Sequence, residues 1–395
     1  MTTIQANVPT PSLASTSGDA PPDHRGSWIP TFGMITTRIM ELTKRRGLMI
    51  TLAVVTIGIP TVFLVVRLLA HAFDPKSYGP AGGYTIFTSL VAGVLFIFGF
   101  IVAATLGCTA GSADLGDGLF RHLVVSGRSR LALYLARVPA GLAIIWSMVA
   151  TGFIIVCAIC VLAAPTKLND NGVNVPPHLS EVQFEAWSAA NADQVICNFP
   201  FFGGPKSSGP QLGNVNCGPH GLVIAGTTNP NGTPVTQAEL KAFAVTIAKQ
   251  NYASYSRLFL YPSDSLMIKS GLWVELEATI GFLVGLGLAS LIGQRTVSVI
   301  LMIVLELILT PIFSRAHIPH LLNAQRSVVG VAMAHIEPGA LPLVFGGGGG
   351  GPGSGPGGGR SQLIPETTTE AIIVIVAWIV VWTALGAWRM MTRDA

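Results

Sequence analysis

Cysteine and histidine residues could carry redox or metal chemistry in this chain, but their sequence context does not favour it. Cys157 and Cys160 have the spacing of a redox pair, yet they lie in a long apolar stretch without the fold context of a redox motif. His317 and His320 are separated by a proline that breaks helical spacing, and His335 lies further on. We therefore expect both cysteines to be ordinary lipid-facing or core residues, and no metal or cofactor to be bound directly.

Phosphate chemistry is not predicted either. The tract 346–359 is almost entirely glycine with proline and serine, but a nucleotide-binding loop needs the pattern G-x-x-x-x-G-K-[ST] between a strand and a helix, and the chain contains no such pattern. In the stretch 203–207, proline stands where the second glycine is required. We interpret 346–359 as a flexible linker. The chain is not expected to be an enzyme or to hydrolyse ATP by itself.

One ionisable residue lies well inside an apolar stretch. Glu306 is flanked by long runs of Leu, Ile, Val and Met, and acidic side chains at such positions usually face a cavity or a partner. It either contributes to a translocation path or exchanges a proton, or it lies close enough to an interface to be hydrated. Glu275 and Glu277 begin another apolar stretch beside Lys269 and are interpreted as interfacial anchors.

The amino-acid composition indicates that the protein lies in a membrane. Half of the 395 residues are apolar, 11% are charged and the mean hydropathy is +0.59, whereas soluble domains are about 25% charged. The net charge of +4 is clustered rather than spread over a basic stripe, so no nucleic-acid partner is expected. The lipid bilayer is the expected environment. Stretches near the length of ~20 residues that a membrane helix needs are 47–69, 84–106, 138–163, 271–292, 297–313 and 371–388.

The basic residues predict the orientation of these segments. Cytoplasmic connections of membrane proteins are enriched in Lys and Arg, and the even-numbered connections and both terminal flanks carry most of the clustered ones. They are Arg38, Lys44, Arg45 and Arg46; Arg121, Arg128, Arg130 and Arg137; Arg295; and Arg389 and Arg393. We therefore predict an all-α polytopic membrane protein of six transmembrane helices, with both termini cytoplasmic and an extracytoplasmic mixed insertion between helices 3 and 4.

The same pattern divides the chain into segments. Pro311 is expected to bend or end the fifth crossing, and Ile35, Ile39 and Leu42 predict a short amphipathic helix, the alternative being an extension of the first crossing. The predicted segments are a disordered N-terminal tail (1–31), an interfacial helix (32–46), helices 1–3 (47–164) with the connection 108–137, the insertion (165–269), helices 4–5 (270–314), an outer loop (315–369), and helix 6 with a cytoplasmic tail (370–395).

Small residues in the fourth crossing predict close helix packing. They recur every fourth position and would form a smooth ridge that another helix can approach. They are Gly281, Gly285, Ala289 and Gly293.

The inserted segment 165–269 has local signals of its own. Ser180 with Gln183, and Thr236 with Glu239, fit capping boxes that begin helices. Cys197 and Cys217 flank a loop rich in Gly, Pro and Asn, so we predict a disulfide in an oxidising exterior, with two buried free thiols as the alternative. The aromatic residues Tyr252, Tyr255, Phe259 and Tyr261 are interpreted as an interfacial belt, or alternatively as part of a small soluble core.

The second connection carries the most informative pattern. It contains Asp114, a glycine-containing turn, the apolar residues Leu119, Phe120 and Leu123, and Arg121, Arg128 and Arg130 around Ser129. This stretch resembles the intracellular loop of type-2 ABC transporter permeases, in which an acidic residue, a glycine turn, a leucine-rich helical turn and a Ser-Arg pair precede the third membrane helix. The family commonly has Glu, Gly-Thr and Pro where this chain has Asp114, Gly118-Leu119 and Gly127.

The resemblance implies a function and partners. It implies that 108–137 is a coupling loop that docks on a cytosolic ATP-binding subunit, which would bind the ATP and Mg²⁺, and that a second permease subunit, identical or a paralogue, completes the path. The chain would then be the permease subunit of an exporter in a bacterial plasma membrane. Alternatively, the arginines only mark a cytoplasmic connection, since any such loop collects them. The alternative function is a membrane-anchored sensor or assembly factor with an extracytoplasmic ligand-binding domain.

Overall fold

The structure, a computed structural model, describes the parts of the chain that carry most of the predicted helices. They are residues 28–74, 81–116, 129–165, 168–170, 173–197, 217–218, 221–222, 227–258, 261–315, 319–338, 341, 364 and 366–392. Within them, six helical segments are long and apolar enough to cross a membrane. The chain is therefore an all-α polytopic membrane protein, as predicted from its apolar stretches.

The six spans are built from uninterrupted α-helices or from α-helices joined by a π-helical segment. The first consists of α2 (Arg46–Ala53), η1 (Val54–Gly58) and α3 (Ile59–Phe73); the second of α4 (Tyr84–Leu90), η2 (Val91–Phe96) and α5 (Ile97–Gly116); the third is α7 (Arg130–Leu162); the fourth is α12 (Asp264–Ile292); the fifth consists of α13 (Arg295–Val304), η3 (Leu305–Leu309) and α14 (Thr310–Arg315); the sixth is α17 (Thr368–Thr392). Pro311 lies in α14, directly after η3, and the helix ends at Arg315.

The N-terminal amphipathic helix is a separate element. α1 (Phe32–Lys44) ends at Arg45, whose backbone leaves the helical conformation, and α2 begins at the next residue. α1 packs against α7, with Leu42 buried in the bundle core. α1 is therefore a helix of its own and not an extension of the first crossing, because the chain breaks at Arg45; its place at the membrane surface stays a prediction.

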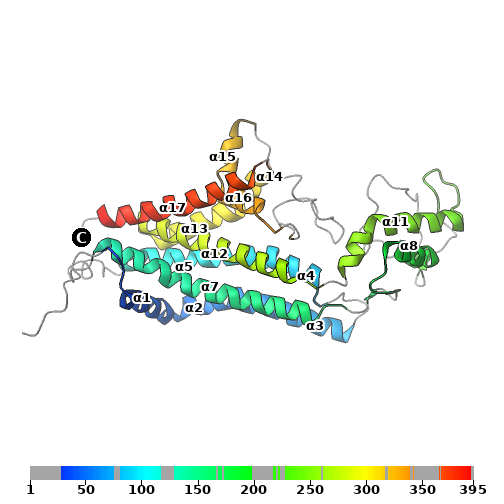
Figure 1. The fold of residues 1–395 in the computed structure, drawn as a ribbon, viewed down its shortest axis with the longest axis horizontal. Coiled ribbons are helices and arrows are strands. Elements are labelled where there is room, and N and C mark those ends of the chain that lie inside the picture. The colour runs from blue at the N-terminus through cyan, green and yellow to red at the C-terminus, as the bar shows by residue number, and fades with distance from the viewer. Residues whose placement is uncertain are drawn as a thin grey trace, which may run out of the picture.

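The helix α12 is central to the bundle. It packs against α5, α7 and α17 and is buried along most of its length. Figure 1 shows the spans side by side, with α1, the first turns of α7 and the last turns of α17 at one end of the bundle. The helices α8 and α11 lie beyond the opposite end (Figure 1). The terminal helices and the inserted domain are thus at opposite ends.

The inserted domain has a small core of its own. Its elements are β1 (Leu168–Asp170), β2 (Val173–Val175), α8 (Glu181–Ala190), α9 (Ala192–Cys197), β3 (Cys217–Gly218), β4 (Gly221–Leu222) and α11 (Gln237–Leu258). The strands form two antiparallel pairs, β1 with β2 and β3 with β4. The capping boxes at Ser180 and Thr236 are confirmed by reciprocal hydrogen bonds with Gln183 and Glu239.

The aromatic residues before the fourth span belong to this core rather than to an interfacial belt. Tyr255 is buried and stacks on Phe184, with ring centroids 3.9 Å apart. Its hydroxyl donates to Pro176 O and accepts from Leu179 N, and burial raises its pKa. The belt interpretation of Tyr252 and Tyr255 was therefore wrong, because both rings pack on α8. Tyr261 is exposed, and Phe259 lies outside the described residues.

Among the residues described between the fifth and sixth spans, three short helices are present. They are η4 (Pro319–Leu321), α15 (Leu322–Arg326) and α16 (Val329–His335). Residues 329–334 of α16 are all buried, and α16 packs against α14 and α17. This burial was not predicted, since an apolar stretch of this length is too short to be recognised as a crossing.

Candidate functional site

Most of the residues predicted to couple the chain to an ATPase lie outside the described part. Leu119, Phe120, Arg121, Leu123 and Arg128 are in this group. Asp114 is in the last turn of α5, and only its backbone is described. These predictions therefore stay predictions.

The two flanks of that connection are held to the bundle by arginine side chains. Arg130, at the start of α7, donates from Nη1 to the carbonyl oxygen of Met391 in α17, 3.2 Å away. Two turns later Arg137 is buried and donates from Nη1 to Gly111 O in α5 at 3.3 Å. The hydroxyl of Ser290 in α12 lies 3.5 Å from the same carbonyl oxygen. The end of α5 and the start of α7 are thus bonded to each other and to their neighbours.

A pair of buried carboxyl groups lies in the middle of the bundle. Glu306 in η3 is 0% exposed and Glu277 in α12 is 1% exposed. The Thr310 hydroxyl lies 3.5 Å from Glu306 Oε2, and it donates a shorter bond to Leu305 O at 3.0 Å. The other Glu306 oxygen and both Glu277 oxygens have no hydrogen-bond partner among the described residues. Glu277 is therefore not the interfacial anchor that its sequence position suggested.

The helix α16 lies against the elements that carry this pair. A Cβ atom added to Gly330 would stand 2.4 Å from the Thr310 side chain, so only glycine allows this approach without displacing Thr310. At the other end of α16, Trp273 Nε1 donates to Met333 O at 3.0 Å. Trp273 is one helical turn before Glu277 on α12. Contacts at both ends therefore hold α16 against α14 and α12.

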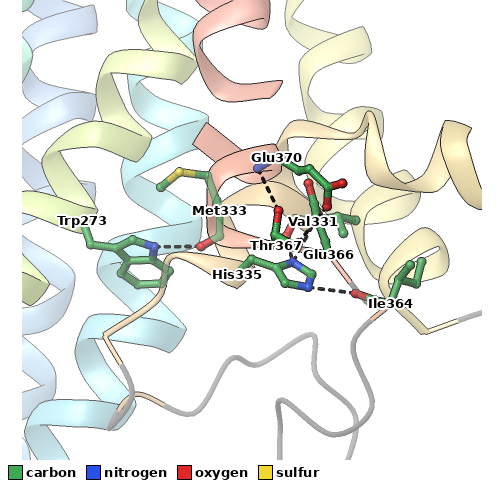
Figure 2. A network of polar contacts seen from close by, with 8 residues as sticks. All are labelled: Trp273, Val331, Met333, His335, Ile364, Glu366, Thr367 and Glu370. Carbon is green, nitrogen blue, oxygen red and sulfur yellow. Dashed lines mark hydrogen bonds and ion pairs between the residues drawn. The ribbon is translucent and has the colours of Figure 1, made fainter. Parts of the chain in front are cut away.

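Beyond α16, a polar network joins its end to the start of the sixth span. Figure 2 shows His335 pointing toward Ile364 and Glu366. His335 Nε2 lies 2.8 Å from Ile364 O, while Nδ1 lies 2.9 Å from Val331 O and 3.3 Å from Glu366 Oε2. Both ring nitrogens thus lie within hydrogen-bonding distance of oxygen atoms. Burial raises the pKa of Glu366, and His335 opposes this shift.

Small residues of α12 lie at close contacts with α5. A Cβ added to Gly281 would be 2.8 Å from Phe100 O, and one added to Gly285 would be 2.7 Å from Ala104 O, both in α5. Ala289 is fully buried on the same side, near Gly111. Gly293, in contrast, ends the helix with a left-handed backbone (φ 78°) and is not part of the ridge.

The cysteines divide into two groups. Cys108, Cys157 and Cys160 are free thiols within the spans, which for Cys157 and Cys160 agrees with their interpretation as ordinary apolar residues. Cys197 ends α9 and Cys217 begins β3, which pairs with β4, and α9 contacts β4. Their side chains lie outside the described residues, so the disulfide stays a prediction. In the described ranges, no group of three or more His, Cys, Asp or Glu side chains is arranged to hold a metal ion.

The sequence analysis thus located Glu306 but missed its neighbour Glu277 and the covering helix α16. Comparison with protein-family models finds no match to this chain, and neither curated proteins nor solved structures give one.

Proposed function

We propose that this chain is the permease subunit of an ATP-binding-cassette exporter, moving a substrate outward across a bacterial plasma membrane. A separate cytosolic subunit would bind and hydrolyse Mg-ATP, and a second permease subunit, a copy or a paralogue, would complete the path. The resemblance of residues 108–137 to the coupling loop of type-2 permeases supports this function, as does the lack of a nucleotide-binding pattern.

The observation that carries the proposal is the gathering of three elements at one end of the bundle. The helix α1 packs on α7, the flanks of the connection 117–128 are there, and α17 ends there (Figure 1). Arg130 and Arg137 bond α7 to α17 and to α5 at this end. A force applied to the connection would therefore act on several spans together, as coupling to an ATPase requires. In this proposal that end is cytoplasmic and the inserted domain is exported.

The test is co-purification of the full chain with an ATP-binding subunit encoded next to it. Replacing Leu119, Phe120 and Leu123 together by Asp should abolish the complex, because charged side chains would not enter an apolar pocket on the partner. Val182→Asp is the matched control: Val182 is a 76% exposed apolar residue at the opposite end, in α8, and its replacement should leave the complex intact. Retention of the ATPase by the triple variant would contradict the docking assignment.

A sensor or assembly factor is the second candidate, favoured by the separate core of the inserted domain. Under that function the control and the triple variant would behave alike toward an ATPase. A regulator or kinase, rather than an ATPase, would then co-purify with the chain.

A further inference from the structure

Glu277 and Glu306 are both buried, one in α12 and the other in the fifth span, and these two spans pack against each other. Their carboxyl groups are close enough to repel each other if both are charged. Three of the four carboxyl oxygens have no hydrogen-bond partner in the described part of the chain, and no ion pair with a described residue compensates either charge. Two acidic side chains are thus buried in neighbouring spans, and among the described residues their one polar contact is the weak one from Thr310 to Glu306.

No cationic side chain described on the surrounding elements is bonded to either carboxyl group. The ionisable residues on the elements packed around the pair are Asp264, Lys269 and Glu275 on α12, Cys108 and Asp114 on α5, Arg130, Tyr134, Arg137, Cys157 and Cys160 on α7, Arg295 on α13, Arg315 on α14, His335 on α16, and Glu370 and Arg389 on α17. Among those with described side chains, none forms an ion pair or hydrogen bond with Glu277 or Glu306.

The position within the spans makes two negative charges very unfavourable. Glu306 is eleven residues after Arg295, the start of its span, which corresponds to ~16 Å along a helix, about half of the ~30 Å hydrocarbon thickness. An isolated carboxylate in such a place is strongly destabilised, and a second one nearby adds repulsion. A single proton removes the repulsion and provides an O–H donor for an oxygen that lacks a partner.

We propose that Glu277 and Glu306 bind one exchangeable proton between them, forming a proton-binding site inside the membrane. The site rests on these contacts and not on the proposed export function. The helix α16 covers it through the Gly330–Thr310 contact and is fastened to α12 by the Trp273–Met333 bond. Loss of the proton would make η3 and α12 repel each other, so protonation favours the packed arrangement in which α16 contacts both α14 and α12.

The test uses the full chain in lipid nanodiscs and the apolar reagent dicyclohexylcarbodiimide, which forms a stable adduct with protonated carboxyl groups in apolar sites. Peptide mass spectrometry assigns each adduct to its glutamate. We expect adducts at Glu277 or Glu306, with a rate that falls roughly tenfold per pH unit once the pair loses its proton. Glu370, an exposed acid at the start of α17, is the internal control and should not react.

Two variants separate a shared proton from a merely buried acid. In Glu306→Gln, Glu277 no longer has a charged neighbour, so its labelling should fall off at lower pH than in the wild type; Glu277→Gln should have the same effect on Glu306. Each variant must elute as the wild type does in size-exclusion chromatography. The absence of an adduct at both glutamates, or a rate independent of pH, would overturn the proposal. Protection by sodium at constant pH would also overturn it, in favour of a metal cation.

Discussion

The indole nitrogen of Trp273 donates a hydrogen bond to the backbone carbonyl of Met333, 3.0 Å away, and the same indole stacks on Phe96 with centroids 4.1 Å apart. One side chain therefore joins α12 to the second span and to α16. Because this carbonyl group is buried, the hydrogen bond is expected to contribute more than one at the surface of the bundle.

Trp273→Phe keeps an aromatic ring but removes the donor, leaving the Met333 carbonyl group unpaired. We expect a loss of about 1–3 kcal/mol in the free energy of unfolding. Trp378→Phe is the control, because Trp378 donates a similar bond to Ser327 O in an exposed position, and its loss should cost only roughly 0.5–1.5 kcal/mol. Thermal unfolding in one detergent compares the two variants; equal losses would contradict the special role of Trp273.

Two glycines on α5 should respond to alanine with opposite signs. At Gly107 a Cβ would stand 2.1 Å from the backbone oxygen of Phe282, so Gly107→Ala must push α5 and α12 apart, costing about 1–3 kcal/mol. At Gly99 nothing lies within 4 Å of the added atom, so Gly99→Ala should stabilise the helix by about 0.5–1 kcal/mol. The melting temperatures should move in opposite directions, and a stabilising Gly107→Ala would contradict the packing described.

Burial makes the stability contribution of Glu366 depend on pH. Its pKa is raised by desolvation, with His335 acting in the opposite direction, so the folded protein holds this proton more tightly than the unfolded chain. The resulting stabilisation is complete below the unfolded value of about 4.3 and is lost as pH rises through the folded pKa. Relative to Glu366→Gln, which cannot ionise, the wild type should lose melting temperature with rising pH. A constant difference would contradict this prediction.

Glu239 should show the opposite pH dependence. Hydrogen bonds from the backbone N–H and the hydroxyl of Thr236 lower its pKa, so its stabilisation is present above the unfolded value and is lost as pH falls through the folded pKa. Relative to Glu239→Gln, the wild type should lose stability of the inserted domain with falling pH. Hydrogen exchange of the first turn of α11 measures this effect locally, and equal exchange at all pH values would count against it.

A substitution in the core of the inserted domain should destabilise this domain while the transmembrane helices stay folded. Phe184 is fully buried among Trp187, Tyr252 and Tyr255, so Phe184→Ala is expected to cost about 3–5 kcal/mol. Val182→Ala, on the same helix but 76% exposed, should have little effect. Limited proteolysis should cleave the Phe184→Ala domain rapidly while the spans stay intact. Simultaneous loss of both parts would show that the two cores are not independent.

Local sequence patterns were sufficient to predict the transmembrane spans and the helix caps. The apolar stretches located all six spans, and the spacing of Ser180 with Gln183 predicted a capping box that the structure contains. These features depend on neighbours along the chain. The helix α1 was predicted for the same reason, from the spacing of Ile35, Ile39 and Leu42.

Features that depend on a partner helix could not be predicted in this way. Glu277 is near the start of an apolar stretch, and only the packing of α12 against its neighbours shows that it is buried. Tyr255 precedes a span, where a belt and a domain core produce the same aromatic pattern. The burial of Val331 depends on α14 and α17, which lie on either side of a long connection. In each case the decisive contact is between residues distant in sequence.

The π-helical segment η3 sets the angular position of everything that follows it in the fifth span. Deleting one residue from it would rotate Thr310 by about 100° relative to Val304, and Gly330 would then meet a different side chain. The wider turn of η3 therefore determines which way Thr310 faces relative to the first half of the span. Through Thr310 it also determines the surface that α16 contacts.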